Sequence, residues 1–247
     1  LDSVLLFSAN NGSVGSELWR SKGTDATTEL VMDINSGSPN SEISQMTNFD
    51  NKAYFSAIDG VNGRELWVSD GTTAGTHIFM NAATGDKNSN PTQLMATDDK
   101  LYFILEDSAT GNELWVTDGT NGGTHLLKDI RTGTDGSDIE NLTRVRDMIY
   151  FTANDGINGA ELWKTDGTTS GTSMVTEVAT GSVGSNPQLL TLSNDTLFYT
   201  AYHPDYGVEL WYVFTNCMVG GFESASACVN DSIQFNDLSN ALGNTIS

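Results

Sequence analysis

Five identical carboxylates recur along this chain at one fixed interval, and they are the first residues to which chemistry could be assigned. Each of them begins a Glu-Leu-Trp tripeptide: Glu17, Glu65, Glu113, Glu161 and Glu209. A set of equivalent carboxylates could line a channel or bind cations. A buried glutamate, by contrast, must be hydrogen-bonded to N–H or hydroxyl groups nearby. We favour the second, structural interpretation, and the first stays open as an alternative.

The loops before two of these glutamates are the best candidates for a metal site. Each loop brings three oxygen-bearing side chains together: Asp59, Asn62 and Glu65 in one, and Asp155, Asn158 and Glu161 in the other. Calcium takes six to eight oxygen ligands. The spacing is not that of an EF-hand, and the third repeat has Asp107 with Thr110 instead. The sequence allows a calcium site here but favours a tight turn held by Asp and Gly, and we expect no other cofactor.

Residues for catalysis are few. The chain has three histidines, and two of them, His77 and His125, fall at equivalent positions, which suits a surface role better than a catalytic triad. It has no Gly-x-Ser-x-Gly, no His-Glu-x-x-His and no phosphate-binding loop. A polysaccharide hydrolase that uses two carboxylates as its catalytic groups remains an alternative. Because near-identical repeats argue against a unique active site, we expect a protein that is not an enzyme.

The element that positions all these residues is an internal repeat of 48 residues. It is marked by the tryptophans, which are equally spaced with no insertion between them: Trp19, Trp67, Trp115, Trp163 and Trp211. A glycine stands two residues before each Glu. An aromatic column runs through Phe7, Phe55, Phe103, Phe151 and Tyr199. We expect the tryptophans to fill structural positions in the core.

Each repeat is predicted to form four short antiparallel strands. Asp-Gly-Thr follows the Trp by three residues in the second to fourth repeats, and an Asp carboxylate can accept a backbone N–H two residues further on. We therefore expect a hairpin between strands three and four, with structural roles for Asp70, Asp118 and Asp166. Repeated four-stranded units are typical of the blades of a β-propeller. A parallel β-solenoid is the second choice, because hairpin turns imply antiparallel neighbours.

Composition narrows the classes of partner. The chain has 11 Lys and Arg against 32 Asp and Glu, a net charge of −21. This excess of negative charge argues against binding to nucleic acid or to anionic membranes. It is consistent with binding to cations or to basic partners. The longest apolar runs are short, so no membrane insertion is expected.

The segment from Glu65 to Thr76, Glu-Leu-Trp-Val-Ser-Asp-Gly-Thr-Thr-Ala-Gly-Thr, resembles the ELWxxDGT repeat family. Similar segments begin at Glu113 and Glu161, and the resemblance covers residues 1–214. It implies large exported bacterial proteins of the Bacteroidetes type. It brings no established enzyme activity and no defined ligand residues.

The pattern stops after Trp211, and residues 215–247 resemble the opening strands of a PKD-type immunoglobulin-like β-sandwich domain. The resemblance lies in Cys228-Val-Asn-Asp-Ser and the Phe235-Asn-Asp-Leu-Ser that follows. Such domains are stalk modules of surface proteins, and their place beside a propeller implies type IX secretion. Cys217 and Cys228 are predicted to pair as a disulfide, as an exported protein would allow. Leu1 aligns with a position just past the first strand of a repeat, so we expect a piece of a longer protein.

Three functions are consistent with these features. We favour a non-enzymatic binding or adhesion module at the cell surface or outside the cell, whose partner is a surface glycan, a protein of another cell, or copies of itself. A structural segment of an assembled surface filament and a polysaccharide hydrolase on a propeller scaffold are the alternatives.

Overall fold

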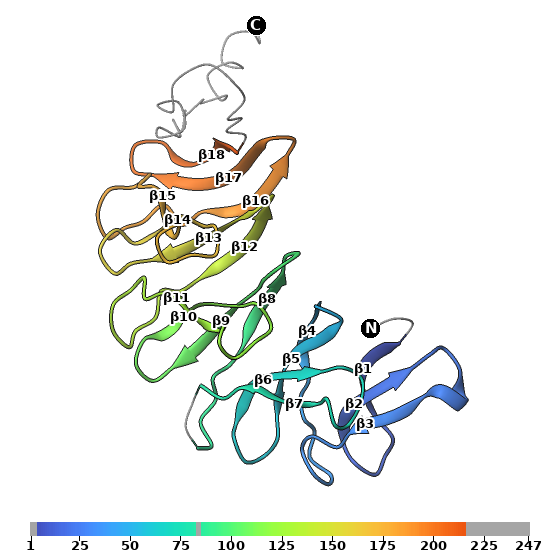
Figure 1. Ribbon diagram of the computed structural model, residues 1–247. Coiled ribbons are helices and arrows are strands. Elements are labelled where there is room, and N and C mark those ends of the chain that lie inside the picture. The colour runs from blue at the N-terminus through green and yellow to red at the C-terminus, as the bar shows by residue number, and fades with distance from the viewer. Residues whose placement is uncertain (1–3, 83–84, 216–247) are drawn as a thin grey trace, which may run out of the picture. The chain divides into compact units, whose positions relative to one another are not determined.

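The computed structural model describes residues 4–82 and 85–215, which are almost entirely strand and turn (Figure 1). Within these ranges the one helical element is a 3₁₀ turn, η1, over Asp25–Thr27. No helix of the described residues has both the length and the apolar character that crossing a membrane would need. The chain divides into two compact units, Leu1–Gly136 and Ser137–Ser247.

The strands form five antiparallel sheets, one for each repeat. Sheet one contains β1 (Leu5–Asn10), β2 (Ser16–Ser21) and β3 (Glu29–Met32). Sheet two contains β4 (Ser44–Phe49), β5 (Lys52–Ile58), β6 (Arg64–Ser69) and β7 (His77–Met80). Sheet three contains β8 (Thr92–Ala96), β9 (Leu101–Asp107), β10 (Gly111–Thr117) and β11 (His125–Lys128).

The second unit holds the remaining two sheets. Sheet four contains β12 (Glu140–Val145), β13 (Met148–Asn154), β14 (Ala160–Thr165) and β15 (Ser173–Thr176). Sheet five contains β16 (Gln188–Ser193), β17 (Thr196–His203) and β18 (Gly207–Phe214). In every sheet the strands lie in chain order, as in the blade of a propeller. This antiparallel order confirms the predicted hairpins and excludes the β-solenoid.

The hairpin between the third and fourth strands is built as the Asp-Gly-Thr signature predicts. In sheet two, Asp70 accepts hydrogen bonds from the backbone N–H and the hydroxyl of Thr72, at 2.8 and 2.7 Å. A Cβ added to Gly75 would lie 2.1 Å from the Asp70 carboxylate, so only glycine fits there. The same two bonds recur at Asp118 and Asp166. These three aspartates thus have the structural role expected of them.

Within each unit, consecutive sheets pack face to face, and adjacent residues of each Glu-Leu-Trp point to opposite sides of the strand. Leu66 packs against Phe103 and Leu105 of sheet three. Trp67, next in the chain, packs against Leu6 and Leu18 of sheet one. In the second unit, Leu162 of sheet four likewise meets Tyr199 and Trp211 of sheet five. Each interface therefore joins the leucine face of one sheet to the tryptophan face of the next.

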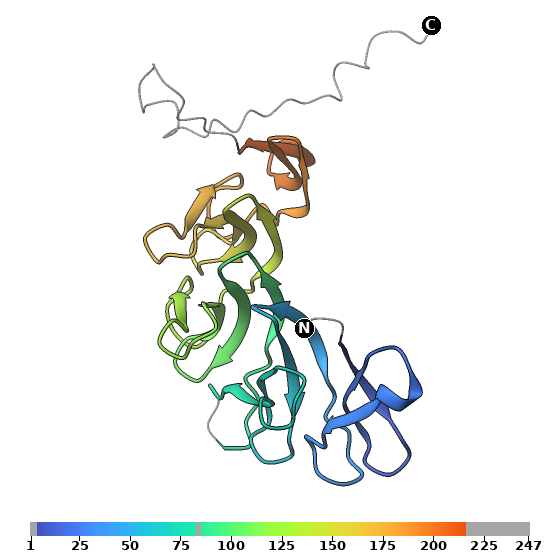
Figure 2. The same cartoon turned by 45° about the vertical axis from the view of Figure 1, so that its right-hand side comes forward.

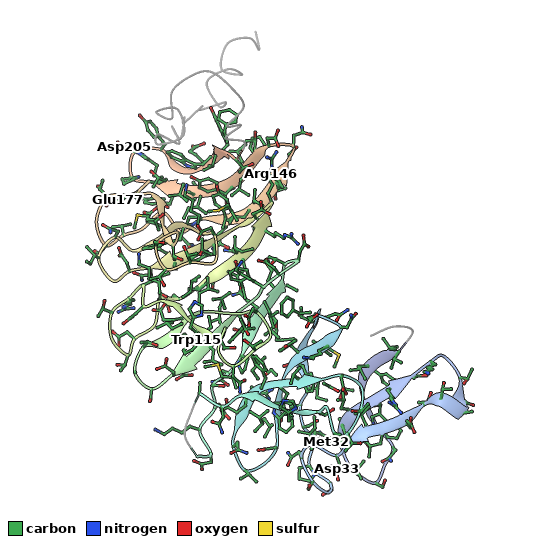
Figure 3. The ribbon with its side chains drawn as sticks, in the orientation of Figure 1. Met32, Asp33, Trp115, Arg146, Glu177 and Asp205 are labelled. Carbon is green, nitrogen blue, oxygen red and sulfur yellow. The ribbon has the colours of Figure 1, made fainter. Side chains whose placement is uncertain are left out.

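The tryptophans occupy equivalent positions in the sheets but are not equally buried. Trp67, Trp163 and Trp211 are buried, whereas Trp19 and Trp115 are half-buried. Trp115, labelled in Figure 3, still packs on the core between sheets two and three. Trp19 lies on the face of sheet one that points away from sheet two, where no described residue of its unit forms a further sheet.

Candidate functional site

Four of the five repeated glutamates are buried structural groups, as favoured from the sequence, whereas Glu209 is half-buried. Glu17, Glu65, Glu113 and Glu161 are completely buried. Glu17 accepts hydrogen bonds from the backbone N–H of Ile34 at 2.7 Å and of Ser41 at 3.0 Å. Burial raises the pKa of Glu17 and Glu161 above the usual value and that of Glu65 to about 7. These four carboxyl groups are buried among backbone N–H and hydroxyl groups and do not line a solvent channel.

Glu17, Glu65 and Glu161 are each held by a serine 24 residues further along the chain, which sequence reasoning did not single out. Ser41, Ser89, Ser137 and Ser185 form a column of fully buried serines at the repeat interval. Ser89 donates its hydroxyl to Glu65, and its carbonyl accepts the N–H of Glu106 in sheet three at 2.8 Å. This Glu–Ser link therefore ties one sheet to the second strand of the next sheet.

The loops proposed for calcium are closed by their own hydrogen bonds. Asp59 accepts the backbone N–H groups of Val61 and Asn62 and the side-chain amide of Asn62, at 2.6–2.8 Å. Burial raises the pKa of Asp59, but these bonds outweigh it and leave the pKa below its usual value. Asp155 and Asn158 repeat the arrangement.

Glu65 and Glu161 of these predicted sites point elsewhere, into the links to Ser89 and Ser185. Among residues 4–82 and 85–215, no group of three His, Cys, Asp or Glu side chains is placed to hold a metal ion. The tight turn expected as the simpler interpretation is present, and the calcium site stays a prediction. Cys217 and Cys228 lie outside the described residues.

The three histidines lie on three different sheets. His77 and His125 are exposed at the first positions of β7 and β11, which agrees with the surface role expected for them. His203, in the other unit, stacks on Tyr206 and Trp211 with ring centroids 4.8 and 6.2 Å away.

The first strand of each complete sheet carries a bulge that the sequence did not reveal. Two residues at the start of the first strand adopt positive φ, Glu42 and Gln45 in one repeat and Asn90 and Gln93 in the next. The strand register shifts between Ser44 and Thr47 in sheet two, the interval that contains Gln45. Bulges of this kind re-aim side chains and are frequent beside functional sites. The bulges interrupt the pairing of the first strands β4 and β8 with their neighbours. These two first strands lie next to each other in the fold (Figures 1 and 2).

An open cavity of about 550 Å³, lined by both polar and apolar atoms, lies beside these bulged strands, inside the first unit. It is lined by Glu42, Ile43, Ser44, Gln45, Ser56, Arg64, Asn90, Pro91 and Thr92. Its most distinctive group is the Arg64 guanidinium, which forms an ion pair with Glu42 and donates to the Ser56 hydroxyl at 3.4 Å. About one fifth of the Arg64 side chain remains exposed, and more than half of the Glu42 side chain does.

Arg64 does not belong to the repeat. The equivalent positions hold Ser16, Asn112, Ala160 and Val208. The other polar side chains of the cavity are amides and hydroxyls, which can both donate and accept hydrogen bonds. The cavity is therefore a place in the first unit where a charged pair that is not part of the repeat lies beside two bulged strands, and we take it as the candidate binding site.

No family model matches the chain, and no curated protein matches it. Among solved structures, it is similar to a mutant puromycin hydrolase, with a TM-score of 0.52 and 16% identity over 86% of this chain and 34% of that one. It is also similar to prolyl oligopeptidase B from Galerina marginata, with a TM-score of 0.51 and 11% identity over 86% of this chain and 32% of that one. The chain thus spans about a third of the length of these proteins. At this identity the likeness shows the fold, which is that of a β-propeller.

Proposed function

We propose that this chain is a non-enzymatic binding module of an exported bacterial surface protein, and that the cavity beside Arg64 binds a surface glycan. The observation that carries the proposal is the Arg64–Glu42 pair in an open cavity beside two bulged strands. The export and the surface location follow from the resemblance of the repeats to the ELWxxDGT family.

The lining of the cavity suits a polyhydroxylated ligand. A sugar presents hydroxyl groups that donate and accept hydrogen bonds, and Gln45, Asn90 and Thr92 can do both in return. The guanidinium of Arg64 is a rigid donor fork, and the carboxylate of Glu42 is a pure acceptor, so together they match a pair of neighbouring hydroxyls. The net charge of −21 disfavours an anionic glycan, and a neutral one is the better fit.

The repeated frame explains why the binding residues are the variable ones. The glutamates, the Asp-Gly-Thr aspartates and the buried serines are all used to hold the sheets together. Side chains outside that set, such as Arg64 and Glu42, are free to differ from repeat to repeat without loss of the fold. Recognition can therefore vary while the scaffold stays constant.

The test is titration of neutral bacterial surface polysaccharides onto the purified chain by calorimetry, with a hydrolysis screen on the same glycans. Arg64→Asn places in sheet two the residue that sheet three has as Asn112, so the fold should tolerate it. We expect the variant to lose at least tenfold in affinity, since a hydrogen bond to a charged group is worth about 1.5–3 kcal/mol.

Arg144→Asn is the matched control, because Arg144 is exposed on β12 in the other unit and should not affect binding. Equal affinity of the Arg64→Asn variant and the unmodified chain would contradict the proposed site. Turnover of a glycan that disappears in Glu42→Gln would show an enzyme instead of a binding module.

A further inference from the structure

Four asparagines of this chain are followed by glycine, and asparagine is among the thermolabile residues of proteins. They are Asn11, Asn62, Asn121 and Asn158. An asparagine loses its side-chain amide when the backbone nitrogen of the next residue attacks its Cγ, and glycine has no Cβ to crowd that nitrogen. The attack requires an asparagine side chain that is free to turn and a glycine N–H that is not bound elsewhere. The folded structure meets these two conditions unequally at the four sites.

Asn62 and Asn158 are fixed inside the loops that precede Glu-Leu-Trp. The side-chain amide of Asn62 donates to the Asp59 carboxylate at 2.6 Å, and that of Asn158 donates to Asp155 at 2.7 Å. Both asparagines are half-buried. The glycines that follow them lie against neighbouring backbone, 2.3 and 2.5 Å from where their Cβ atoms would be. Rotation of either amide would break a hydrogen bond to a charged group, so both sites are protected.

Asn11 is exposed, but its amide oxygen and the attacking nitrogen are both engaged. The oxygen accepts hydrogen bonds from the backbone N–H and the hydroxyl of Ser13, at 2.9 and 2.8 Å. The backbone N–H of Gly12, which would have to attack, donates to the Asn10 side chain at 2.7 Å. The local turn therefore protects this site as well.

Asn121 differs from the other three. It lies in the hairpin between β10 and β11, where both Asn121 and Gly122 are exposed. Within the described part of the chain, no hydrogen bond involves the Asn121 side chain or the Gly122 N–H, and a Cβ on Gly122 would meet nothing within 4 Å. The turn is held without them, because Asp118 accepts from Thr120. Both conditions for the attack are met here.

The equivalent turns of the neighbouring repeats have a different pair of residues. Thr73-Ala74 stands in sheet two and Thr169-Ser170 in sheet four. The hydroxyl of Thr73 donates to the backbone carbonyl of Val31 in sheet one at 2.7 Å. Asn121 thus replaces a threonine that, in sheet two, ties the turn to the preceding sheet. The Asn-Gly pair is a departure from the repeated frame at an exposed position.

We propose that Asn121 is a site of self-modification, which converts to aspartate and isoaspartate in the folded protein while the other three Asn-Gly pairs keep their amides. The Gly122 nitrogen loses its proton and forms a bond to the Asn121 Cγ. The bond from Cγ to Nδ2 breaks, ammonia leaves, and a cyclic imide remains. Water then opens the imide at one of its two carbonyl groups. The balance is one water consumed and one ammonium released, with no oxidant or cofactor. The inference is independent of glycan binding.

Either product changes the hairpin. Opening at Cγ gives aspartate, which adds a negative charge to a turn that already contains Asp118. Opening at the backbone carbonyl gives isoaspartate, whose main chain runs through the former side chain and is longer. The longer main chain displaces the Asn121 carbonyl, which accepts the N–H of Thr124 at 3.4 Å just before β11 begins at His125. We therefore expect conversion to loosen the fourth strand of sheet three.

The experiment incubates the purified chain at mildly alkaline pH, where the attacking nitrogen loses its proton more readily. Peptide mapping by mass spectrometry follows the four sites, and a sample unfolded in guanidinium is incubated alongside until it has converted. In the folded chain we expect the Asn121 peptide to convert while the other three keep their amides. In the unfolded sample all four should convert at similar rates, because the hydrogen bonds that protect three of them are lost.

Gly122→Ala is the matched variant, because sheet two has Ala74 at this position and the fold should tolerate it. Its Cβ crowds the attacking nitrogen, so conversion of Asn121 should slow roughly tenfold. After incubation the unmodified chain should melt at a lower temperature than before, whereas Gly122→Ala should melt unchanged.

Two results would overturn the proposed site. One is an Asn121 that keeps its amide in the folded chain while the unfolded sample loses it. The other is conversion of Asn11, Asn62 or Asn158 in the folded chain as fast as that of Asn121. Identical melting of the fresh and the converted chain would overturn the expected loosening of the hairpin.

Discussion

The buried Glu65 carboxyl makes the stability of this protein depend on pH. Its side chain is fully buried, and burial raises the pKa to about 7 in the folded state from an ordinary value of 4.5. The folded protein therefore binds a proton here that the unfolded chain has already lost above pH 4.5. The resulting stabilisation is fully present below pH 4.5 and decreases as the pH rises to about 7. A difference of this size corresponds to about 3 kcal/mol.

Glu65→Gln tests this reasoning, because glutamine has nearly the shape of the protonated acid and cannot ionise. Urea unfolding followed by tryptophan fluorescence gives the free energy of unfolding at intervals between pH 4.5 and 8. We expect the unmodified chain to lose up to about 3 kcal/mol across this range through Glu65. In Glu65→Gln that part of the loss should disappear. The remaining slope comes from groups such as Glu17 and Glu161, whose pKa values burial also raises.

The control is Glu140→Gln, at an exposed strand position. Its unfolding free energy should follow that of the unmodified chain at every pH. Aspartates such as Asp59 and Asp155 have lowered pKa values, so their stabilisation is lost only as the pH falls through the acidic range and does not mask the effect. Parallel curves for the unmodified chain and Glu65→Gln would refute the reasoning, because they would mean that the carboxyl ionises normally in the folded state.

Three further outcomes follow from the packing and the turns. Trp67→Ala should lower the free energy of unfolding by about 3–5 kcal/mol in urea titrations. Trp19→Ala should lower it by clearly less, because that ring is half-buried. Equal losses would contradict the packing described for sheet one. Gly75→Ala should destabilise by about 1–3 kcal/mol, because its Cβ would lie 2.1 Å from the turn carboxylate and break its hydrogen bonds. Gly122→Ala, where a Cβ meets open space, should unfold like the unmodified chain. The calcium prediction requires that EGTA lower the melting temperature and that Asp59→Ala abolish the response, so identical melting curves with and without calcium would reject it.

Most of the scaffold could be predicted from the sequence because the same short motifs recur in each repeat. The spacing of the tryptophans gave the sheet number, and Asp70-Gly-Thr gave the hairpin through a bond between residues two apart. The buried role of Glu65 also follows from its recurrence. Features of this kind depend on contacts within a few residues or on one strand, which a single repeat contains.

The cavity could not be predicted, because it depends on how two sheets meet. Gln45, in the first strand β4, and Glu42, just before it, adopt positive φ, and neither residue type predicts this conformation. Ser89 could have been found from its column, but its partner Glu65 lies half a repeat away, and serines are common in turns. Trp19 is less buried than Trp67 although the two repeats share the same pattern, so the burial of a single tryptophan could not be predicted from that pattern.

The Glu–Ser link has a consequence for how such a protein can gain or lose blades. The link joins residues 24 positions apart, which is half of a repeat. The glutamate lies within one sheet and its serine lies after the last strand of that sheet, so the residues of a single sheet do not contain both partners of the link. Excising β4–β7 alone, Ser44–Met80, would remove Glu65 and leave the buried Ser89 hydroxyl without its acceptor. Excising any 48 consecutive residues would restore an equivalent glutamate to every serine, wherever the cut falls. Recombination between gene copies, which shifts by whole periods, would therefore lengthen or shorten this scaffold without a compensating mutation.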